Sequence, residues 1–258
     1  MTPAPSPAPS VAPAHPGLRV AVRDLRKRYH TQEVLRGVDL EIAPAEIFVL
    51  MGPSGSGKSV FLRHLIGLES PDSGEVRIEG ELLADDFRDR FRMAMVFQSG
   101  GLLNSLTVAQ NVGLYLSEHR LRSPAEIDAV VAEKLALVQL PDGTANKYPT
   151  ELSGGMRRRV AIARALTIDP QLILFDEPTA ELDPLVALAI GREIVALNRR
   201  THATTLVVTH DRDLAFGIAH RIGFLVEGRI LAVGTPDVIR AHPLPLLQQF
   251  LAADFTPQ

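Results

Sequence analysis

The sequence contains no cysteine, and its charges almost cancel. Without cysteine the chain can form neither disulfide bonds nor thiolate metal sites, which agrees with a reducing compartment. Thirty acidic and 27 basic side chains leave a formal net charge of −3, so no overall positive field favours nucleic acid. No segment approaches the ~20 continuous apolar residues of a membrane-spanning helix. We therefore expect no nucleic-acid partner, and contact with a membrane only through another protein.

The first residues lack the basic n-region and the apolar h-region of a signal peptide. Residues 1–17, MTPAPSPAPSVAPAHPG, are rich in proline, alanine and serine, and we expect a disordered tail there. The 258 residues suffice for one large domain or two small ones, and 46% of them are hydrophobic, as in an ordinary globular protein.

The stretch MGPSGSGKSV, residues 51–60, is rich in glycine and ends on a lysine followed by a hydroxyl side chain. It matches G-x-x-x-x-G-K-[ST], in which backbone amides surround phosphates, the lysine reaches the β/γ-phosphates and the hydroxyl binds Mg²⁺. A flexible glycine turn is the alternative, but an apolar strand pattern precedes the loop and a helical pattern follows it. We expect a phosphate site made by Gly52, Pro53, Ser54, Gly55, Ser56, Gly57, Lys58, Ser59 and Val60.

Strand and helix patterns alternate around this loop. Residues 18–79 are strand-like apart from the loop and its helix, and a helical insertion of about 70 residues follows the strand pattern RMAMVFQ. Within the insertion, Val108, Val112 and Tyr115 share one helical face, and Ser123-Pro124-Ala125-Glu126 forms a capping box. RIGFLVEGRILAVG predicts a hairpin that turns at 227–228. The pattern predicts a mostly parallel α/β core, preceded by a β-rich layer and split by helices.

Two carboxylates follow a second buried strand. LILFDEP places Asp176 and Glu177 at the end of four apolar residues, and ligands of open α/β sheets bind at the carboxyl ends of strands. We expect Asp176 to hold Mg²⁺, and Glu177 to orient and deprotonate the attacking water. A helix cap or a turn is the alternative reading of the same pair.

A second anion-binding pattern, LSGGMRRRV at 152–160, places Ser-Gly-Gly at a helix start. Together with the Lys58 loop, the FDEP carboxylates, Gln98 and His210, it closely resembles the nucleotide-binding domain of ATP-binding-cassette (ABC) proteins over about residues 18–240. The resemblance implies a P-loop NTPase fold with a RecA-like core, an N-terminal antiparallel β layer and an inserted helical subdomain at about 99–168. The domain would cover 18–242, with a tail or helix at 243–258.

The resemblance also implies ATP and Mg²⁺ as ligands and assigns further roles. Tyr29 would stack on adenine, with a plain strand-end tyrosine as the alternative. Gln98 would touch Mg²⁺ and the water and move with a membrane partner, and His210 would contact the γ-phosphate. The implied catalytic set is Glu177, His210, Gln98 and Lys58, and the implied metal set is Ser59, Gln98 and Asp176.

In this family the Ser-Gly-Gly motif acts on the opposite subunit. Ser153, Gly154 and Gly155 would bind the γ-phosphate held by a second copy, so that two chains enclose two ATP molecules head to tail. A monomer is then expected to be inactive. Two residues depart from the family pattern: Met156 replaces a common glutamine, and Glu181 stands where a small residue is usual. The charge of Glu181 leaves the geometry of its loop open.

Several longer stretches resemble the ATPases of the Mla (maintenance of lipid asymmetry) group, notably GPSGSGKSVFLRHLIGL and VFQSGGLLNSLTVAQNV. That resemblance implies a subunit that powers a separate membrane permease for phospholipid transport, with MCE-domain and small STAS-type accessory proteins as partners. It would lie on the cytoplasmic face of the inner membrane, where a permease coupling helix docks near residues 100–108. Open alternatives are another cargo, such as an amino acid or osmolyte, and a soluble ABC ATPase. Residues 60–151 leave no room for the long coiled coil of DNA-repair members.

The last stretch, AHPLPLLQQFLAADFTPQ, has Leu244, Leu247 and Leu251 at helical spacing. A helix packed on its own domain and a helix that docks a neighbouring subunit both remain open.

Overall fold

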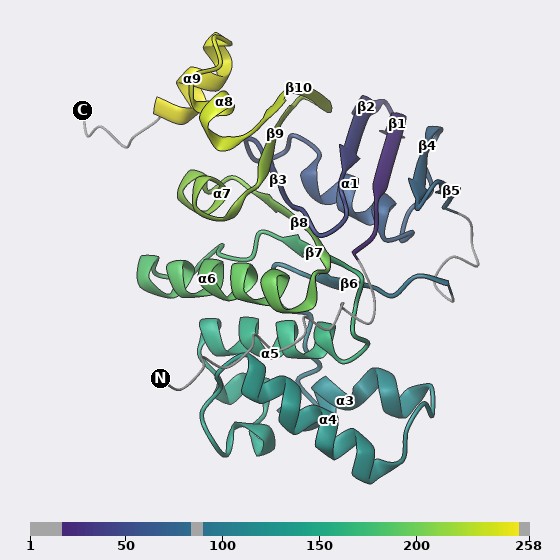
Figure 1. The fold of residues 1–258 in the computed structure, drawn as a ribbon, viewed down its shortest axis with the longest axis vertical. Coiled ribbons are helices and arrows are strands. Elements are labelled where there is room, and N and C mark those ends of the chain that lie inside the picture. Colours follow the sequence, from purple (N-terminus) through teal and green to yellow (C-terminus); the bar gives the residue numbers. More distant parts are fainter. Residues whose placement is uncertain (1–16, 84–89, 253–258) are drawn as a thin grey trace, which may run out of the picture.

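The computed structural model describes residues 17–83 and 90–252. Residues 1–16 of the predicted tail lie outside the described residues, as do 253–258 at the other end. The described chain contains two sheets (Figure 1). The smaller sheet has the order β2-β1-β4-β5 and is antiparallel, with strands β1 (Val20–Tyr29), β2 (Gln32–Ile42), β4 (Ser73–Ile78) and β5 (Glu81–Leu82).

The larger sheet has the order β10-β9-β3-β8-β7-β6. Its parallel strands are β3 (Ile47–Met51), β6 (Met93–Val96), β7 (Leu172–Asp176), β8 (Thr204–Thr209) and β9 (Arg221–Val226). Strand β10 (Arg229–Gly234) pairs antiparallel with β9 at one edge. The hairpin between them turns at Glu227 and Gly228, both with positive φ as a type I′ turn requires, and this confirms the predicted turn.

The central strands are buried on both faces, so their alternate residues enter two different cores. Phe48 and Leu50 of β3 pack toward the smaller sheet and helix α1 (Lys58–Leu65), which lies between the two sheets. Val49 and Met51 of the same strand face the opposite core. Helix α1 buries Phe61, which joins the first core.

The opposite core is covered by helices (Figure 1). The inserted region supplies α3 (Val108–Glu118), α4 (Pro124–Leu137), two short 3-10 turns (Thr144–Asn146 and Pro149–Glu151) and α5 (Gly154–Leu166). Helices α6 (Pro184–Thr201) and α7 (Arg212–Ile218) follow β7 and β8. The predicted capping box at Ser123 and Glu126 is present at the start of α4, with 2.8 Å from the Ser123 amide to Glu126.

The face that Val108, Val112 and Tyr115 share on α3 is buried only in part. Val108 and Val112 are fully buried, but Tyr115 is 44% exposed and lies against the ring of His119. Leu116 completes the buried face of α3 instead. The helical period fixes which residues share a side of α3, while the neighbouring helices decide where burial along that side ends.

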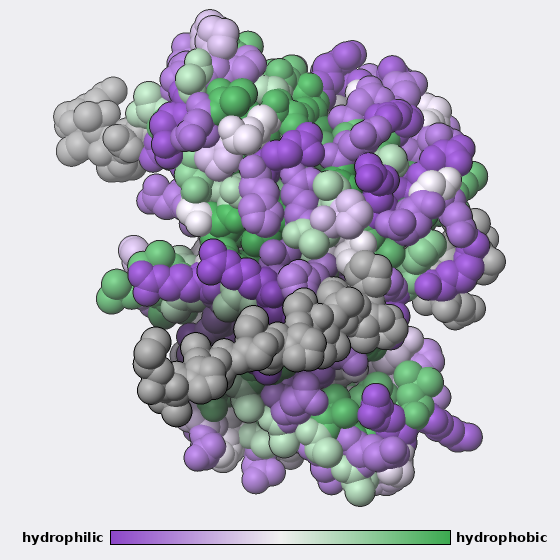
Figure 2. Space-filling view, in the orientation of Figure 1, coloured by the Kyte–Doolittle hydropathy of each residue, from purple (hydrophilic) through white to green (hydrophobic). Residues whose placement is uncertain are grey.

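The chain ends on two short helices, α8 (Pro236–Arg240) and α9 (Pro245–Ala252). Leu247 of α9 is fully buried in the helical-side core, and Phe250 packs on Phe224 with 5.3 Å between ring centroids. Over the outer strands β1, β2 and β4, Figure 2 shows mostly hydrophilic side chains. Within 17–83 and 90–252, every helix is too short or too polar to pass through a lipid bilayer. The architecture confirms the expected P-loop NTPase fold class.

Candidate functional site

The glycine-rich loop runs from the end of β3 to the first turn of α1. A Cβ on Gly52 would stand 2.1 Å from the Leu225 carbonyl oxygen, so only glycine fits there. Gly57 is the N-cap of α1 with φ +105, and no side chain caps the helix. The first-turn amides of α1 therefore face the loop without a competing side-chain acceptor, which suits an anion.

Lys58 is a buried cation held at this loop. Its Nζ donates to the carbonyl oxygens of Gly52 (2.9 Å) and Pro53 (3.1 Å) and lies 3.4 Å from Glu177 Oε1. Burial lowers the pKa of Lys58, and the Glu177 carboxylate opposes that shift. The two carbonyls and one carboxylate fix the ammonium where the loop meets the sheet.

Asp176 and Ser59 meet across the loop although 117 positions separate them in the chain. The Ser59 hydroxyl donates to Asp176 Oδ1 at 2.8 Å. Burial raises the pKa of Asp176, while the Ser59 hydrogen bond and Lys58 lower it. An adjacent hydroxyl and carboxylate form a hard oxygen pair of the kind that Mg²⁺ takes in nucleotide sites.

Glu177 is held in place by three donors and a strained backbone. Its φ of +46 is unusual for a residue with a side chain, and such strain clusters at functional sites. Oε2 accepts from Thr209 Oγ1 (3.1 Å) and from the His210 amide (3.2 Å), and lies 3.0 Å from His210 Nδ1. The structure thus brings Lys58, Ser59, Asp176, Glu177 and His210 into one cluster.

Tyr29 and Gln98 lie apart from that cluster's hydrogen bonds. The Tyr29 hydroxyl at the end of β1 donates to Glu69, and its ring is 37% exposed. Lys27 Nζ lies 5.7 Å from the Tyr29 ring centroid. Gln98 sits in an exposed turn after β6, and within the described part of the chain its side chain makes no hydrogen bond to Ser59 or Asp176.

The Ser-Gly-Gly motif begins α5, a different helix from the one that the P-loop begins. Ser153 is its N-cap and accepts from the Met156 amide at 3.3 Å. A Cβ on Gly155 would come 2.6 Å from Val186 Cγ1, so a side chain there would collide with α6. The motif therefore presents backbone amides at an exposed helix start, separate from the Lys58 cluster in the same chain.

Sequence reasoning missed two residues that hold the site. Thr209 Oγ1 donates to Glu177 and accepts from the Asp211 amide at 3.0 Å. Asp211 accepts from Thr179 Oγ1 at 3.1 Å and caps α7 through the Leu214 amide. Asp211 had a signal in the sequence, because Asp followed by a helical pattern predicts an N-cap. Only the fold shows that this cap also braces the loop after β7.

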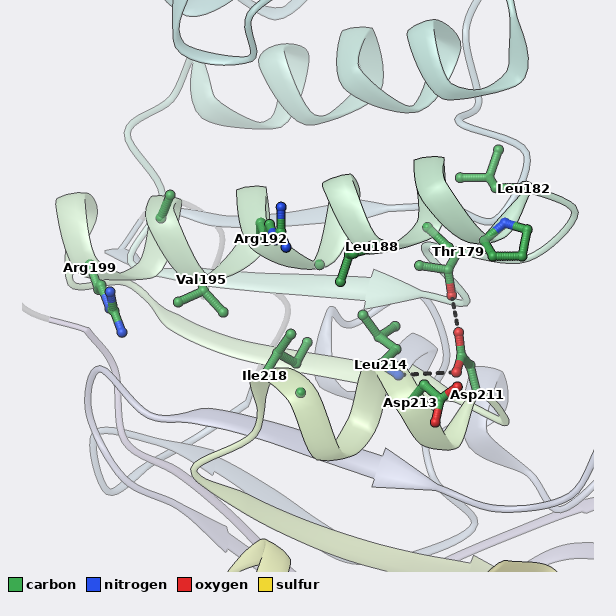
Figure 3. Close-up of a pocket in the computed structure, with 15 residues that line it drawn as sticks. Thr179, Leu182, Leu188, Arg192, Val195, Arg199, Asp211, Asp213, Leu214 and Ile218 are labelled. Atoms are coloured by element: carbon green, nitrogen blue, oxygen red, sulfur yellow. Dashed lines mark hydrogen bonds between the residues drawn. The ribbon is translucent and has the colours of Figure 1, made fainter.

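Two cavities adjoin this region. A polar one of about 320 Å³ opens beside His210 and is lined by Thr179, Ala180, Glu181, His210, Asp211, Arg212 and Asp213. A larger one of about 750 Å³ lies between α6 and α7 (Figure 3). Apolar side chains such as Leu188 and Ile218 line it, Arg192 and Arg199 lie along α6, and no P-loop residue contributes.

The residues present fit a Mg²⁺-nucleoside triphosphate. The Ser56 hydroxyl is buried beside the loop without a partner among the described residues, so it can donate to an anion. Lys58 supplies a cation, and Ser59 with Asp176 supplies oxygen ligands. The described residues hold no cluster of three or more metal-binding side chains, but Mg²⁺ needs only one or two protein ligands beside phosphate oxygens and water.

The comparisons with known proteins agree with this site. The ABC transporter family model matches residues 35–180. A sulfate/thiosulfate import ATP-binding protein, CysA of Caulobacter vibrioides, is 40% identical over 88% of this chain and 67% of its own length. A probable ribonucleotide transport ATP-binding protein, mkl of Mycobacterium leprae, is 38% identical over 91% of this chain and 69% of its own. The chain thus spans about two thirds of these relatives.

Solved structures of ATP-binding cassettes also match this chain over most of its length. The ATP-binding cassette MJ0796, a dimer in a post-hydrolysis state bound to ADP and Pi, matches with a TM-score of 0.77 and 35% identity, covering 84% of this chain and 98% of that one. The cassette cbiO1 of Clostridium perfringens, part of the transporter complex cbiONQ, matches with a TM-score of 0.77 and 26% identity, covering 90% and 94%.

Proposed function

Because the chain belongs to the ABC transporter family of ATP-binding proteins, we propose that it powers a separate membrane permease that moves phospholipids, as in the Mla group. The chain is an ATPase and an ATP-binding transporter subunit, and it takes ATP with Mg²⁺. The observation that carries the nucleotide part of the proposal is the cluster of Lys58, Ser59, Asp176, Glu177 and His210 at the end of the central strands.

We assign the chemistry residue by residue. Bound Mg²⁺ neutralises charge on the phosphate oxygens. Lys58 turns from the Gly52 and Pro53 carbonyls toward phosphate, and Ser59 and Asp176 hold the metal. The Glu177 carboxylate first gives up its contacts with Lys58 and the His210 ring and accepts a hydrogen bond from the attacking water. It then takes the proton of that water as the water oxygen bonds to the γ-phosphorus, and ADP leaves with the electrons of the broken bond between the γ-phosphorus and its bridging oxygen. Thr209 keeps the carboxylate in place.

The remaining site residues complete the assignment. Tyr29 offers its exposed ring to adenine, Gln98 reaches Mg²⁺ and the water, and His210 reaches the γ-phosphate. We take 18–242 as the nucleotide-binding domain and about 99–168 as its helical subdomain. Helices α3, α4 and α5 pack on one another, which supports that division.

We further propose that two copies enclose two ATP molecules. The exposed start of α5 at Ser153 lies on a helix distinct from α1, so its first-turn amides other than that of Met156 can bind a phosphate held by another copy. The solved relative MJ0796 is described as a dimer. ATP that touches both copies favours the closed pair, and loss of the γ-phosphate reopens it.

The permease would dock on the loop and helix that follow β6, and it would hold the chain at the cytoplasmic face of the inner membrane. Phe97, Leu103 and Tyr115 are large apolar side chains exposed in this region. A permease that docks on this stretch of the chain would cover these exposed apolar side chains. The cassette cbiO1 is described as part of a transporter complex, which supports the same arrangement.

The lipid cargo rests on the sequence stretches GPSGSGKSVFLRHLIGL and VFQSGGLLNSLTVAQNV, because cargo does not touch an ATPase subunit. MCE-domain and STAS-type proteins are the further partners that this cargo implies. Sulfate or thiosulfate import is a second candidate, favoured by the 40% identity with CysA.

The test is purification of the tagged chain from solubilised membranes, with identification of the co-purified proteins and lipids by mass spectrometry. The proposal predicts a permease, an MCE-domain protein and bound phospholipid. Leu103→Asp should release the permease, whereas Leu121→Asp, 57% exposed beyond α3, should not. Recovery of a sulfate-binding protein, or of no membrane protein at all, would contradict the lipid proposal.

A further inference from the structure

Arg158 is a buried cation of α5 that none of the roles above uses. Its side chain is only 5% exposed, and its NH1 donates to the Phe97 carbonyl oxygen at 2.8 Å. Its Nε has no partner among the described residues. Since Phe97 directly precedes Gln98, a side chain of the helix that begins at Ser153 holds the backbone next to Gln98.

The rest of this loop is anchored on the same helix. Arg164 of α5 donates to the carbonyls of Gly100 (2.9 Å) and Gly101 (2.6 Å). Gln98 and Ser99 stay exposed between the anchored carbonyls of Phe97 and Gly100. The backbone on both sides of Gln98 is thus fixed to α5, while the glutamine side chain itself remains accessible.

The charges around Arg158 point toward the nucleotide site. Burial lowers the pKa of Arg158, and the carboxylates of Glu181 and Asp176 oppose that shift. Glu181 stands in the loop before α6, and Asp176 ends β7. The guanidinium is buried, is bonded to the Phe97 carbonyl and is attracted to both carboxylates.

We propose that Arg158 is a positioning residue that places Gln98 relative to the Ser59–Asp176 pair and couples this placement to the helix that begins at Ser153. The inference rests on the proposed roles of Gln98 and Ser153. When α5 moves to meet a phosphate held by the second copy, the Phe97 carbonyl and Gln98 move with it. Residues around a metal site that act through a ligand typically change activity or metal affinity by 10–100-fold when removed.

The experiment measures steady-state ATPase activity of the purified full-length chain at saturating ATP while free Mg²⁺ is varied. Arg158→Gln should lower kcat by roughly 10–100-fold and raise the Mg²⁺ concentration for half-maximal rate, with KM for ATP at saturating Mg²⁺ unchanged. Arg158→Lys should recover part of the rate, because an ammonium can still donate to the Phe97 carbonyl. Arg200→Gln is the matched control. It removes an arginine that is exposed in the last turn of α6, outside the anion-binding pattern and the loop, and it should behave as wild type.

A double-mutant cycle with Gln98→Ala separates positioning from a merely structural role. If Arg158 acts through Gln98, Arg158→Gln adds no further loss in the Gln98→Ala background. Additive losses, or a wild-type Mg²⁺ profile for Arg158→Gln, overturn the inference about Arg158 and leave the proposed role of Gln98 in place. A wild-type profile for Gln98→Ala overturns the proposed role of Gln98 as well. Should Arg158→Gln fail to fold, Arg158→Lys takes its place in the cycle, with the same criterion of non-additivity.

Discussion

Glu177→Gln removes the proposed base with little change of shape. The amide oxygen of glutamine can keep the hydrogen bonds from Thr209 and the His210 amide. Its NH₂ group then faces Lys58 Nζ, which in the wild-type protein lies 3.4 Å from the Glu177 Oε1 carboxylate oxygen. Because Lys58 retains the Gly52 and Pro53 carbonyls, the loss of this contact should cost about 1–2 kcal/mol of nucleotide-free stability.

The effect on rate should be far larger. General-base catalysis contributes about 10²–10⁴-fold, which corresponds to roughly 2.7–5.4 kcal/mol of activation free energy. We therefore expect kcat for phosphate release to fall by that factor. Binding of ATP should persist because Lys58, Ser59 and Asp176 are intact, so an ATP-bound dimer should accumulate on size exclusion.

The assay is phosphate release under saturating MgATP, with a parallel binding measurement that uses a fluorescent ATP analogue. Glu227→Gln is the matched control, since Glu227 lies exposed in the β9–β10 turn and should keep the wild-type rate. If Glu177→Gln turns over ATP at the wild-type rate, the assignment of Glu177 as the base is wrong.

Four further predictions follow from the same contacts. Lys58→Ala should abolish detectable binding of the ATP analogue, because no other cation of the cluster reaches the loop; retained affinity would count against the phosphate site. Tyr29→Ala should weaken ATP binding by about 1–3 kcal/mol while Tyr29→Phe does not, since stacking needs the ring alone; equal losses would implicate the hydroxyl instead. Leu247→Ala should lower the free energy of unfolding by about 2–5 kcal/mol, against little change for the exposed Leu246→Ala, as chemical denaturation can measure. The Ser123 hydroxyl and amide lower the pKa of Glu126. The Glu126 carboxylate therefore stabilises the fold above its unfolded-state pKa, and this contribution is lost as pH falls through its folded-state pKa. Thermal melts of Glu126→Gln as a function of pH should lack this part of the acid dependence.

The local features of the fold were predictable because short-range chemistry decides them. The capping box at Ser123 and the turn at Glu227 each depend on a few neighbouring residues, and the structure confirms both. The family resemblance supplied the fold class, and the comparisons confirm it.

Long-range pairing could not be read from the sequence. The order of strands in the larger sheet places β8 between β3 and β7, so the loop after β3 and Asp176 at the end of β7 lie at the same edge of the sheet, where Ser59 donates to Asp176 at 2.8 Å. The contact of Arg158 with the Phe97 carbonyl has no local signal either, because 61 positions separate the two residues. Tyr115 was expected on a shared helical face and is exposed, since packing against α4 and α5 ends that face at Leu116. The individual roles of the site residues stay predictions.

We propose that two copies of this chain must close on ATP before either can cleave it. The most direct measurement is the ATPase rate per chain as a function of chain concentration at constant saturating MgATP. The rate per chain should rise with concentration as copies pair and then level off. A rate per chain that stays constant down to concentrations at which only monomers are present would contradict it.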